Sequence, residues 1–551
     1  MIKTKKRADI WTVYSLVILA LFILFLIYPM GSMFKQAVFN KEGEFTLQYF
    51  QKFFGEKYYF STLINSLKST TVVTLVALLL GIPFAYVYTF YRLKGARLLY
   101  VLSILCCMSA PFIGAYSWIL LMGRSGVVTV FLKTFLGIRV GSIYGFQGIV
   151  LVQSLKLFPL VFIYMTGAFR NIDNSLIEAS ENLGCTGVRR FFNVTLMLTM
   201  PTVLAAALLV FMRAFADFGS PLLIGEGYRT FPVEIYNQYL GEQGGDHNFA
   251  AAISVIAILI TALIFLIQKY TASRFSFSLN ALHPVQKKTP GGLFSVVIHL
   301  FSYFLVFIAF VPQLYVMYTS FKNVNNKLFA PGYSFISYEA AMKKQLILSI
   351  KNTVVIGVTA LVIIIFVAIL IAYLVVRRKS VVNNAIDVIS MLPYIIPGSV
   401  VGIALVVSFN RGPLVLTGSM AIMVVALCIR RLPYTIRSSV ASLQQIPITI
   451  EEAAISLGSS KMGAFFKVTV PMMSNGIIAG AILSWIAIIT ELSTAIILYN
   501  SKTITLTLST YIAVNRGTYG TAAAFATILT ILTTISLLIY MKISKAEDIK
   551  L

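Results

Sequence analysis

Long stretches of apolar residues constrain this chain more than any other feature of its sequence. The segment from Asn352 to Val376, for example, contains no charged residue. A helix needs about 20 such residues to cross the hydrocarbon core of a bilayer. Of the 551 residues, 58% are hydrophobic and only 11% are charged, which is too few charges to cover a soluble protein of this size. The chain is therefore predicted to be an all-α polytopic membrane protein.

About twelve membrane-spanning helices are predicted from these stretches. Their approximate bounds are 10–34, 62–91, 98–123, 146–169, 198–224, 249–270, 293–320, 350–376, 383–409, 413–436, 474–498 and 520–543. The Gly-rich segment 124–144 is expected to be an outer or re-entrant element. An even number of spans places both termini on one side of the membrane, and the basic residues near each end identify that side as cytoplasmic. The basic N-terminus precedes no small-residue cleavage site, which favours an uncleaved first helix over a signal peptide.

The net charge of +25 follows from this topology. Lysines and arginines gather in the loops beside the spans, as the positive-inside rule requires, and nucleic-acid binding is not expected. The four cysteines have no CxxC spacing and the three histidines are scattered, so no zinc or haem site is predicted and any metal ligands remain unknown.

An internal repeat divides the chain. A constant shift of 274 residues aligns the polar stretch 178–201 with the stretch from Glu452 to Pro471, and it aligns Asp217 with Glu491. We expect a first half at 1–270, a cytoplasmic linker at 271–292 and a second half at 293–551. Because each half has six spans, the halves share one orientation and form a parallel 6+6 repeat.

Each polar stretch begins with a short amphipathic helix, predicted at about 174–184 and about 448–458. Asp173 or the pair Asn174-Ser175 can cap the first helix, and Pro447 with Thr449 can start the second. A glycine ends each helix by allowing a left-handed residue. The glycines are Gly184 and Gly458.

These helices resemble the EAA loops of binding-protein-dependent ABC import permeases. The resemblance rests on the matched Glu-Ala and Leu-Gly pairs, which are Glu178, Ala179, Leu183, Gly184, Glu452, Ala453, Leu457 and Gly458. It implies a type I importer fold in which these residues couple the permease to two copies of an ABC ATPase. The first copy departs from the family pattern, because it has Met197 where the second has Pro471.

A second group of residues is predicted to line the translocation pathway or its gate: Arg213, Asp217, Ser220, Glu491, Ser493 and Thr494. Ionisable residues inside spans are costly unless they are paired or face a wet cavity. A structural ion pair is the alternative for Arg213 and Asp217, which are four residues apart. Against it, Ala487 replaces the arginine beside Glu491. For Lys156 and its counterpart Arg430, snorkelling to the lipid headgroups is the favoured interpretation.

Around these acids, the stretches from Phe215 to Pro221 and from Thr490 to Thr494 resemble the ferric-iron permease class. Related permeases carry 2-aminoethylphosphonate, thiamine, polyamines or sulfate. The resemblance implies that an extracytoplasmic binding protein delivers the substrate to a permease in the bacterial plasma (inner) membrane. Oxygen ligands suit Fe³⁺, but the cations in the spans would suit an anion equally well, so charge leaves the substrate open.

The sequence contains no Gly-x-x-x-x-Gly-Lys-Ser/Thr motif, so ATP and Mg²⁺ are expected to bind the partner ATPase and this chain is not expected to be an enzyme or to hold a cofactor. An ion-coupled secondary transporter is the alternative of another class, but it does not explain the matched helices. A membrane enzyme is less favoured, since no catalytic arrangement of side chains stands out.

Overall fold

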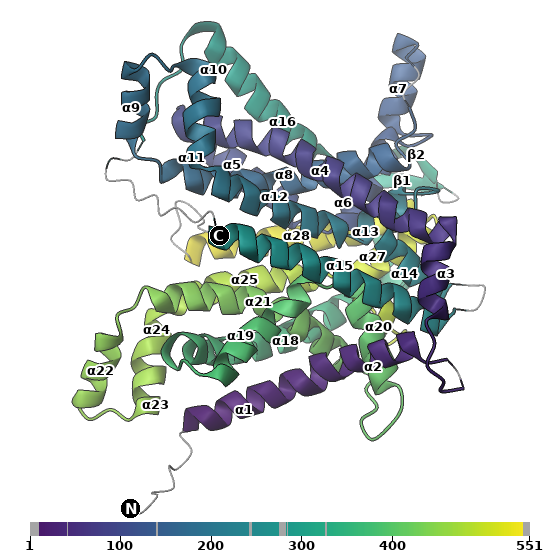
Figure 1. Cartoon of the computed structure of the whole chain (residues 1–551). Helices are drawn as coiled ribbons and strands as arrows, with labels where there is room; N and C mark the ends of the chain where they lie inside the picture. The colour runs from purple at the N-terminus through teal and green to yellow at the C-terminus, as the bar shows by residue number, and fades with distance from the viewer. Residues whose placement is uncertain are drawn as a thin grey trace, which may run out of the picture. The chain divides into compact units, whose positions relative to one another are not determined.

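The computed structural model (Figure 1) describes residues 10–40, 42–138, 141–241, 245–274, 283, 285–325 and 328–543. The basic residues before Ile10, residues 275–282 and 284 of the predicted linker and the last eight residues lie outside these ranges. Helices make up nearly all of the described structure. Its strands are the short antiparallel pair β1 (Lys322–Asn325) and β2 (Leu328–Tyr333).

The chain folds into two compact units, which we call unit 1 and unit 2. Unit 2 takes its described residues from Lys52–Glu234 and Ile256–Phe335. Its helices are α4 (Lys57–Phe90), α5 (Ala96–Met108), α6 (Pro111–Met122), α7 (Val127–Leu136), α8 (Phe146–Arg170), α9 (Asn174–Asn182), α10 (Gly187–Arg190), η2 (Phe191–Thr195), α11 (Leu196–Leu198), α12 (Met200–Phe215), α13 (Gly219–Ile224) and α16 (Gly292–Ser320).

Unit 1 takes its described residues from Met1–Gln51, Ile235–Val255 and Ile336–Ile549. Its helices are α1 (Ile10–Phe22), η1 (Ile23–Ile27), α2 (Tyr28–Val38), α17 (Ile336–Lys343), α18 (Leu346–Arg377), α19 (Val381–Ile395), α20 (Gly398–Phe409), α21 (Met420–Gln444), α22 (Ile448–Ser456), α23 (Lys461–Ala464), η3 (Phe465–Thr469), α24 (Val470–Met472), α25 (Ser474–Ile489), α26 (Ala495–Leu498), α27 (Leu506–Asn515) and α28 (Tyr519–Ile543). Residues of α3 (Gln48–Gly55), α14 (Phe231–Leu240) and α15 (His247–Arg274) fall in both units.

Each unit contains the same three-helix bundle. In unit 2, α12 packs on α4 and α8, which pack on each other, and in unit 1 α25 packs in the same way on α18 and α21. Small residues allow the helices to approach closely. A Cβ added to Gly81 of α4 would lie 2.6 Å from the Cβ of Val161, and one added to Gly480 of α25 would lie 2.7 Å from the Cα of Thr435. The sequence repeat is therefore also a structural repeat.

The compact units do not coincide with the linear halves of the sequence. The first helix of the chain, α1, packs on α18 and α19 in unit 1, which consists mainly of the second half. The first helix of the second half, α16, packs on α5 and α6 in unit 2. The two halves thus exchange their first helices, which a repeat in sequence does not reveal.

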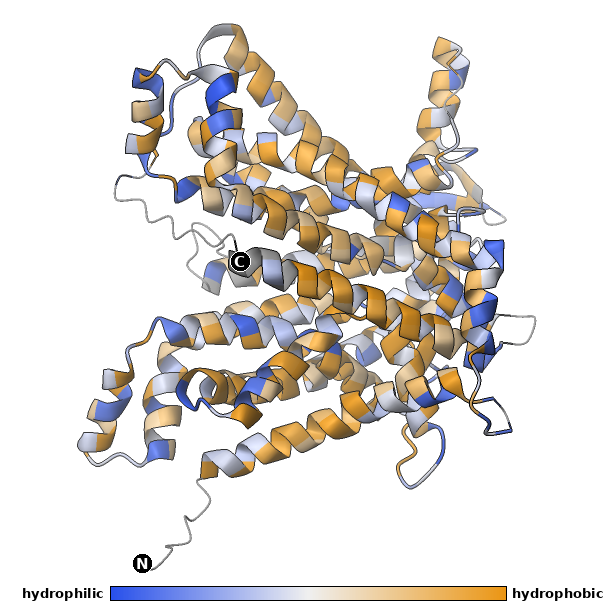
Figure 2. Ribbon diagram, viewed as in Figure 1, coloured by the Kyte–Doolittle hydropathy of each residue, from blue (hydrophilic) through white to orange (hydrophobic). Residues whose placement is uncertain are grey.

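Eight helices of the described residues are long and apolar enough to span a membrane, or eleven if each of three bent pairs is one span. This confirms the all-α polytopic class, and Figure 2 shows the apolar residues running along the long helices. The predicted span 413–436 corresponds to α21, whose middle carries Arg430 and Arg431 and which is not among the eleven. The predicted span 98–123 is instead two helices, because Pro111 starts α6 after a break at Ser109. The candidate membrane span in this region is Phe112–Leu136, which overlaps the expected outer element at 124–144.

Corresponding helices bend at corresponding residues. The segment Gly187–Leu198 meets Met200–Phe215 at 75°, and Lys461–Met472 meets Ser474–Ile489 at 70°. Just before each bend lies a π-helical turn, η2 or η3, at positions related by the same 274-residue shift. Such turns occur frequently at functional sites. Together they connect each short polar helix to the bundle through a fixed angle.

Candidate functional site

The first of the two short polar helices is α9, and its ends are built as the sequence predicts. The Asp173 carboxylate accepts a hydrogen bond from the backbone N–H of Ser175 at 2.9 Å, which caps the helix. At the other end Gly184 adopts a φ of 79°, and the N–H of Cys185 bonds back to the carbonyl of Ser180 at 2.8 Å. This Schellman geometry requires a left-handed residue, which glycine adopts without a Cβ clash.

The second short helix, α22, ends in the same geometry. It starts after Pro447, which makes no side-chain cap, and Gly458 has a φ of 92°. The N–H of Ser459 bonds to the carbonyl of Ala454 at 3.0 Å. We refer to α9 and α22 together as the motif helices.

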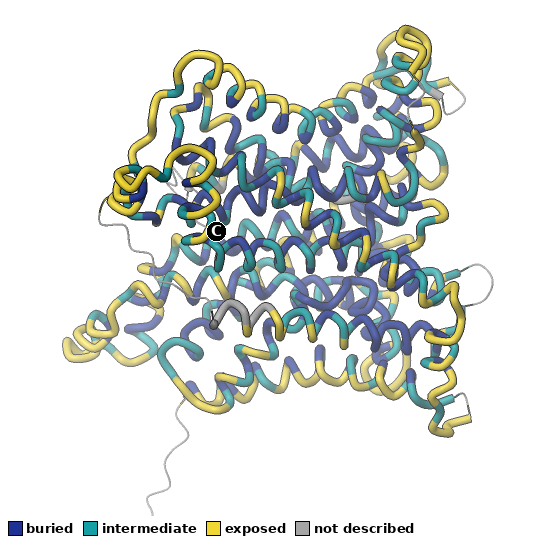
Figure 3. Tube along the Cα trace, turned by 45° about the horizontal axis from the view of Figure 1, so that its top comes forward, coloured by how far each residue is buried: buried dark blue, intermediate teal, exposed yellow. Residues whose placement is uncertain are grey.

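Each motif helix has an exposed leucine at its C-terminal end, which we call the leucine tip. Leu183 is 87% exposed and Leu457 is 89% exposed. Glu178 and Glu452 are exposed as well, as are Ala179 and Ala453. Figure 3 shows these segments among the exposed parts of the chain. An apolar side chain at such a polar tip is suited to a pocket on a soluble partner.

The buried faces of the two motif helices are held by different contacts. In unit 1, Glu451 is buried and accepts a hydrogen bond from the Tyr373 hydroxyl of α18, with Arg377 Nε 3.9 Å from the carboxylate. In unit 2, the corresponding residue is Ile177, which is also buried. The charged residue that ties α9 to its surroundings is instead Glu181, which pairs with Arg190 of α10.

An aromatic contact joins each motif segment to the long helix of its bundle. The ring centroids of Tyr86 of α4 and Phe191 of η2 are 4.9 Å apart, and those of Tyr373 of α18 and Phe465 of η3 are 4.7 Å apart. Phe191 and Phe465 are related by the repeat, and Tyr86 and Tyr373 occupy corresponding places near the ends of α4 and α18. A displacement of either motif segment therefore acts directly on a helix of about 50 Å.

The acid of the first half, Asp217, lies in the break between α12 and α13. Its Oδ1 accepts the N–H of Gly219 at 3.1 Å, and its Oδ2 accepts the Ser220 hydroxyl at 2.6 Å and Gln153 Nε2 at 3.1 Å. Because α12 ends at Phe215, Asp217 and Arg213 do not share one face of a continuous helix. Gly219 to Pro221 form the first turn of α13, directly after this break, so the four-residue spacing of Arg213 and Asp217 is not a spacing within one helix.

The acid of the second half, Glu491, lies in the break between α25 and α26. Its Oε1 is 2.5 Å from Arg430 Nη1 and accepts hydrogen bonds from the Ser493 hydroxyl and the Thr494 N–H. Its Oε2 pairs with Arg431 Nη2. Arg430 is buried and bound to Glu491, so the snorkelling interpretation is wrong for this residue. Two guanidinium groups therefore share this one carboxylate.

Glu491 also borders a small cavity inside unit 1. Its lining includes Thr353, Thr505 and Gly357, and its volume is about 10 Å³. That is room for about one water molecule, whereas ligand pockets enclose roughly 300 Å³ or more. The described residues contain no group of three His, Cys, Asp or Glu placed to hold a metal ion. Within unit 1 this cavity is therefore not a substrate pocket.

Two adjacent polar residues near the start of α4 hold the loop after α13. Two residues near the start of α18 hold the loop after α26 in the same way. In unit 2, Asn65 Nδ2 donates to the carbonyl of Arg229 at 3.2 Å, and the Ser66 hydroxyl accepts the N–H of Phe231 at 2.7 Å. Tyr228 donates to the Asn65 carbonyl, and burial raises the pKa of Tyr228 to about 12, so the phenol stays protonated.

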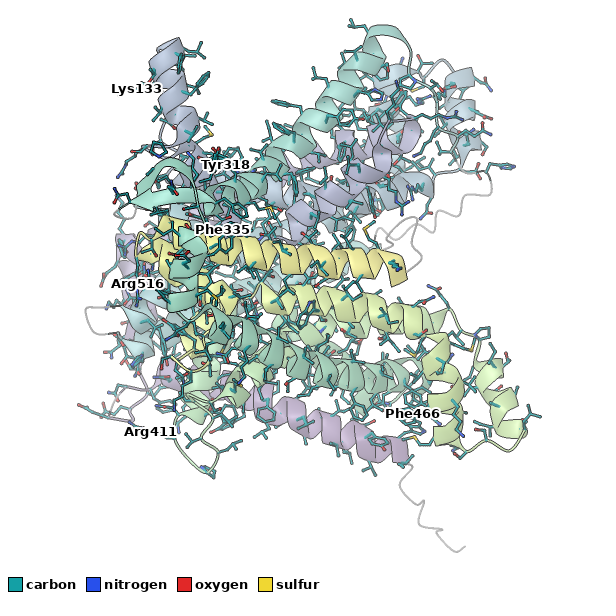
Figure 4. The ribbon with its side chains drawn as sticks, turned by 180° about the vertical axis from the view of Figure 1, so that it is seen from behind. Lys133, Tyr318, Phe335, Arg411, Phe466 and Arg516 are labelled. Carbon is teal, nitrogen blue, oxygen red and sulfur yellow. The ribbon has the colours of Figure 1, made fainter. Side chains whose placement is uncertain are left out.

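The same clamp recurs in unit 1. Asn352 Nδ2 donates to the carbonyls of Lys502 and Ile504 at 2.8 and 2.9 Å, and the Thr353 hydroxyl accepts the N–H of Leu506 at 2.9 Å. In both units the clamp lies at the opposite end of the long helix from the motif helix. In unit 1, Figure 4 shows Arg411 and Arg516 at that end and Phe466 at the other.

The structure places the predicted residues Asp217, Ser220, Glu491, Ser493 and Thr494 at or beside the two helix breaks, and their role in a pathway stays a prediction. Sequence reasoning missed Arg431, Gln153 and the anchoring residue Glu451. Arg431 directly follows Arg430, and an arginine pair in the middle of an apolar span was the available signal. For Glu451 the only signal was a second glutamate beside Glu452.

The fold and these sites define a polytopic membrane protein with two copies of one bundle, each carrying an exposed motif helix. The family described as binding-protein-dependent transport system inner membrane component matches residues 77–277 and 360–546. Since these segments make up more than half of the chain, the protein belongs to this family of ABC permeases.

Two relatives that are similar in sequence agree with this assignment. The ferric transport system permease protein FbpB of Actinobacillus pleuropneumoniae is 27% identical over 519 residues, covering 93% of this chain and 75% of FbpB. The putative 2-aminoethylphosphonate transport system permease protein PhnU of Salmonella typhimurium is 25% identical over 272 residues, covering 49% of this chain and 93% of PhnU. A solved bacterial ABC transporter involved in the import of the acidic polysaccharide alginate matches with a TM-score of 0.39 and 20% identity, covering 48% of this chain and 96% of that one.

Proposed function

We propose that this permease is the membrane subunit of an ATP-driven importer, and that α9 and α22 each bind one subunit of an ABC ATPase pair. The observation that carries the proposal is the pair of exposed leucine tips, Leu183 and Leu457, on helices that are fixed at both ends. A rigid helix with an apolar tip can transmit a displacement of the ATPase to the bundle, whereas a flexible loop would change its own conformation instead.

In this mechanism, closure of the ATPase pair moves the two motif helices, and the bundles follow by alternating access. The contacts of Tyr86 with Phe191 and of Tyr373 with Phe465 support this route, because they join the motif segments to α4 and α18. ATP and Mg²⁺ bind the partner subunits, which supply the energy. The chain lies in the bacterial inner membrane with both termini in the cytoplasm.

An extracytoplasmic binding protein delivers the substrate to the end of each bundle that carries the Asn65 and Asn352 clamps. These clamps support a docking role, because they hold the loops after α13 and α26 rigid and rigid loops lose little entropy on binding. The acids Asp217 and Glu491, with Arg213, Ser220, Ser493 and Thr494, then line the pathway or its gate.

Ferric iron is the substrate that we propose. Its support is the similarity to FbpB, which extends over most of both chains, whereas PhnU aligns with about half of this chain. The small cavity beside Glu491 and the lack of a carboxylate cluster among the described residues favour recognition by the binding protein over recognition by the permease. 2-Aminoethylphosphonate is the second candidate because of the PhnU similarity.

The substrate is tested by uptake into proteoliposomes that contain the permease and its ATPase, with a binding protein loaded with Fe³⁺ or with 2-aminoethylphosphonate. Accumulation of ⁵⁵Fe that requires ATP and the loaded receptor is expected. Uptake of the phosphonate alone would replace iron by the second candidate.

A further inference from the structure

The connection between the two halves approaches α9 before it enters the second half. We call its described part, residues 283 and 285–291, the linker strap. At the start of α9, the carbonyl of His283 accepts the N–H of Asn174 at 2.9 Å, and the Asp173 carboxylate accepts the N–H of His283 at 3.2 Å. The His283 ring nitrogen Nδ1 is 3.7 Å from the same carboxylate.

At the other end of α9 the strap makes a charged contact. Lys288 Nζ lies 3.0 Å from Glu181 Oε1, and this carboxylate also pairs with the buried Arg190 of α10. The strap therefore touches α9 near both of its ends, and through Glu181 it reaches the segment that follows.

The backbone of the strap is fixed independently of these side chains. The N–H of Lys288 bonds to the carbonyl of Phe90 at 2.8 Å, and its carbonyl accepts the N–H of Arg92 at 3.1 Å. This is a parallel bridge to the end of α4. The neighbouring Lys287 places its amine 5.0 Å from the centre of the Tyr88 ring.

The same α4–α5 loop holds the start of α16, which begins four residues after Lys288. Tyr91 packs on Phe294 with ring centroids 5.2 Å apart, and His299 Nε2 accepts the N–H of Lys94 at 3.3 Å. The path from α9 through the strap to α16 thus consists of fixed contacts, all inside unit 2.

We propose that the linker strap is a positioning segment that ties α9 to α16, so that movement of the first motif helix also moves the first helix of the second half. This inference rests on the proposed function, in which closure of the ATPase pair displaces α9. The strap attaches to a charged residue, Glu181, whose counterpart in α22 is the apolar Ile455. At the position where the strap contacts α9 through a carboxylate, α22 therefore has an apolar side chain.

The test compares Lys288→Glu, which sets a like charge against Glu181, with Gln286→Glu, which adds a negative charge at an exposed side chain two residues away. Both are assembled with the ATPase and the loaded receptor in nanodiscs and proteoliposomes. Lys288→Glu should lower the substrate transported per ATP hydrolysed by about fivefold, since an exposed ion pair controls little more than that factor. Lys288→Arg should retain the wild-type ratio. A Lys288→Glu ratio equal to that of the wild type or of Gln286→Glu would overturn the inference.

A second measurement needs no transport. Hydrogen–deuterium exchange of the full chain in nanodiscs should show faster exchange over residues 174–184 in Lys288→Glu and unchanged exchange there in Gln286→Glu. Equal protection in the two variants would refute the strap. A wild-type protein that binds no ATPase would instead contradict the proposed function, while the exchange result would still decide whether the strap holds α9.

Discussion

The Tyr373 hydroxyl of α18 donates a hydrogen bond to the Glu451 carboxylate at the buried face of α22, 78 residues further along the chain. Glu451 immediately precedes the exposed Glu452 of the repeated Glu-Ala pair. One glutamate thus anchors the helix to the bundle while its neighbour faces the solvent. This division of roles explains how a short polar helix can be both rigid and available to a partner.

Removing the anchor should destabilise the protein far more than removing its neighbour. Glu451→Ala leaves the Tyr373 hydroxyl without its acceptor and Arg377 without its nearby carboxylate, and breaking a buried charged contact costs about 3 kcal/mol. Glu452→Ala, at an exposed position, should change stability by less than about 0.5 kcal/mol. Thermal unfolding in detergent measures both variants. Equal melting temperatures would show that Glu451 is not an anchor.

The leucine tips should matter for the partner and not for the fold. Leu183→Ala and Leu457→Ala remove side chains that are almost fully exposed, so the melting temperature should stay unchanged. Association with the ATPase should weaken by about tenfold or more for each, as for an apolar anchor in a pocket. Val381→Ala, which is 86% exposed outside the motif, is the control. Undiminished ATPase binding in both leucine variants would remove the tips from the interface.

The glycine at the end of each motif helix should resist substitution. Gly458 has a φ of 92°, and a Cβ in left-handed backbone costs about 1–2 kcal/mol. Gly458→Ala should therefore fray the end of α22, lowering hydrogen–deuterium protection over 455–459. Gly291→Ala, where the backbone is extended and open space surrounds the residue, provides the control. Full protection in Gly458→Ala would mean that the turn tolerates a side chain.

The pathway acids are tested with the isosteric amides. These remove the carboxylate that Arg430 and Arg431 share, so thermal unfolding of the variant is measured beside its uptake. In the double variant Asp217→Asn, Glu491→Gln the hydroxyl and backbone donors keep an oxygen acceptor while both negative charges are removed. We expect normal assembly with the ATPase and uptake below about a tenth of the wild-type rate, a loss of about 1.4 kcal/mol in the transport step. Wild-type uptake would leave both acids with a structural role as caps of α13 and α26.

The Asn clamps should fix the loops beyond those caps. Asn352→Ala removes two hydrogen bonds to the loop around Lys502, at about 1 kcal/mol each. Receptor-stimulated ATP hydrolysis should then need more receptor for half-maximal effect, while hydrolysis without receptor should not change. The adjacent and exposed Lys351→Ala is the control. An unchanged receptor dependence would separate the clamp from docking.

The sequence predicts the parts of this protein that depend on neighbouring residues. The cap at Asp173 and the left-handed Gly184 and Gly458 follow from local backbone chemistry, and the structure confirms them. Apolar stretches likewise predict most of the long helices.

Contacts between distant segments were not predictable from one sequence. Arg430 and Glu491 are 61 residues apart, and only the packing of α21 against α25 brings them together. The exchange of α1 and α16 between the compact units has no local signature either, because an apolar helix packs equally well on many apolar surfaces. The interrupted span at Ser109 was missed although Pro111 marks it, since apolar content outweighed the proline in the prediction.

Receptor-stimulated ATP hydrolysis tests the central claim most directly. The permease is reconstituted in nanodiscs with its candidate ATPase, and hydrolysis is measured with Fe³⁺-loaded receptor, with phosphonate-loaded receptor and with neither. We predict that the ATPase co-purifies with the chain and that the Fe³⁺-loaded receptor stimulates hydrolysis, an effect lost in the Leu183→Ala, Leu457→Ala double variant. Failure of any ATPase to associate, or stimulation that survives the loss of both leucines, would contradict the account.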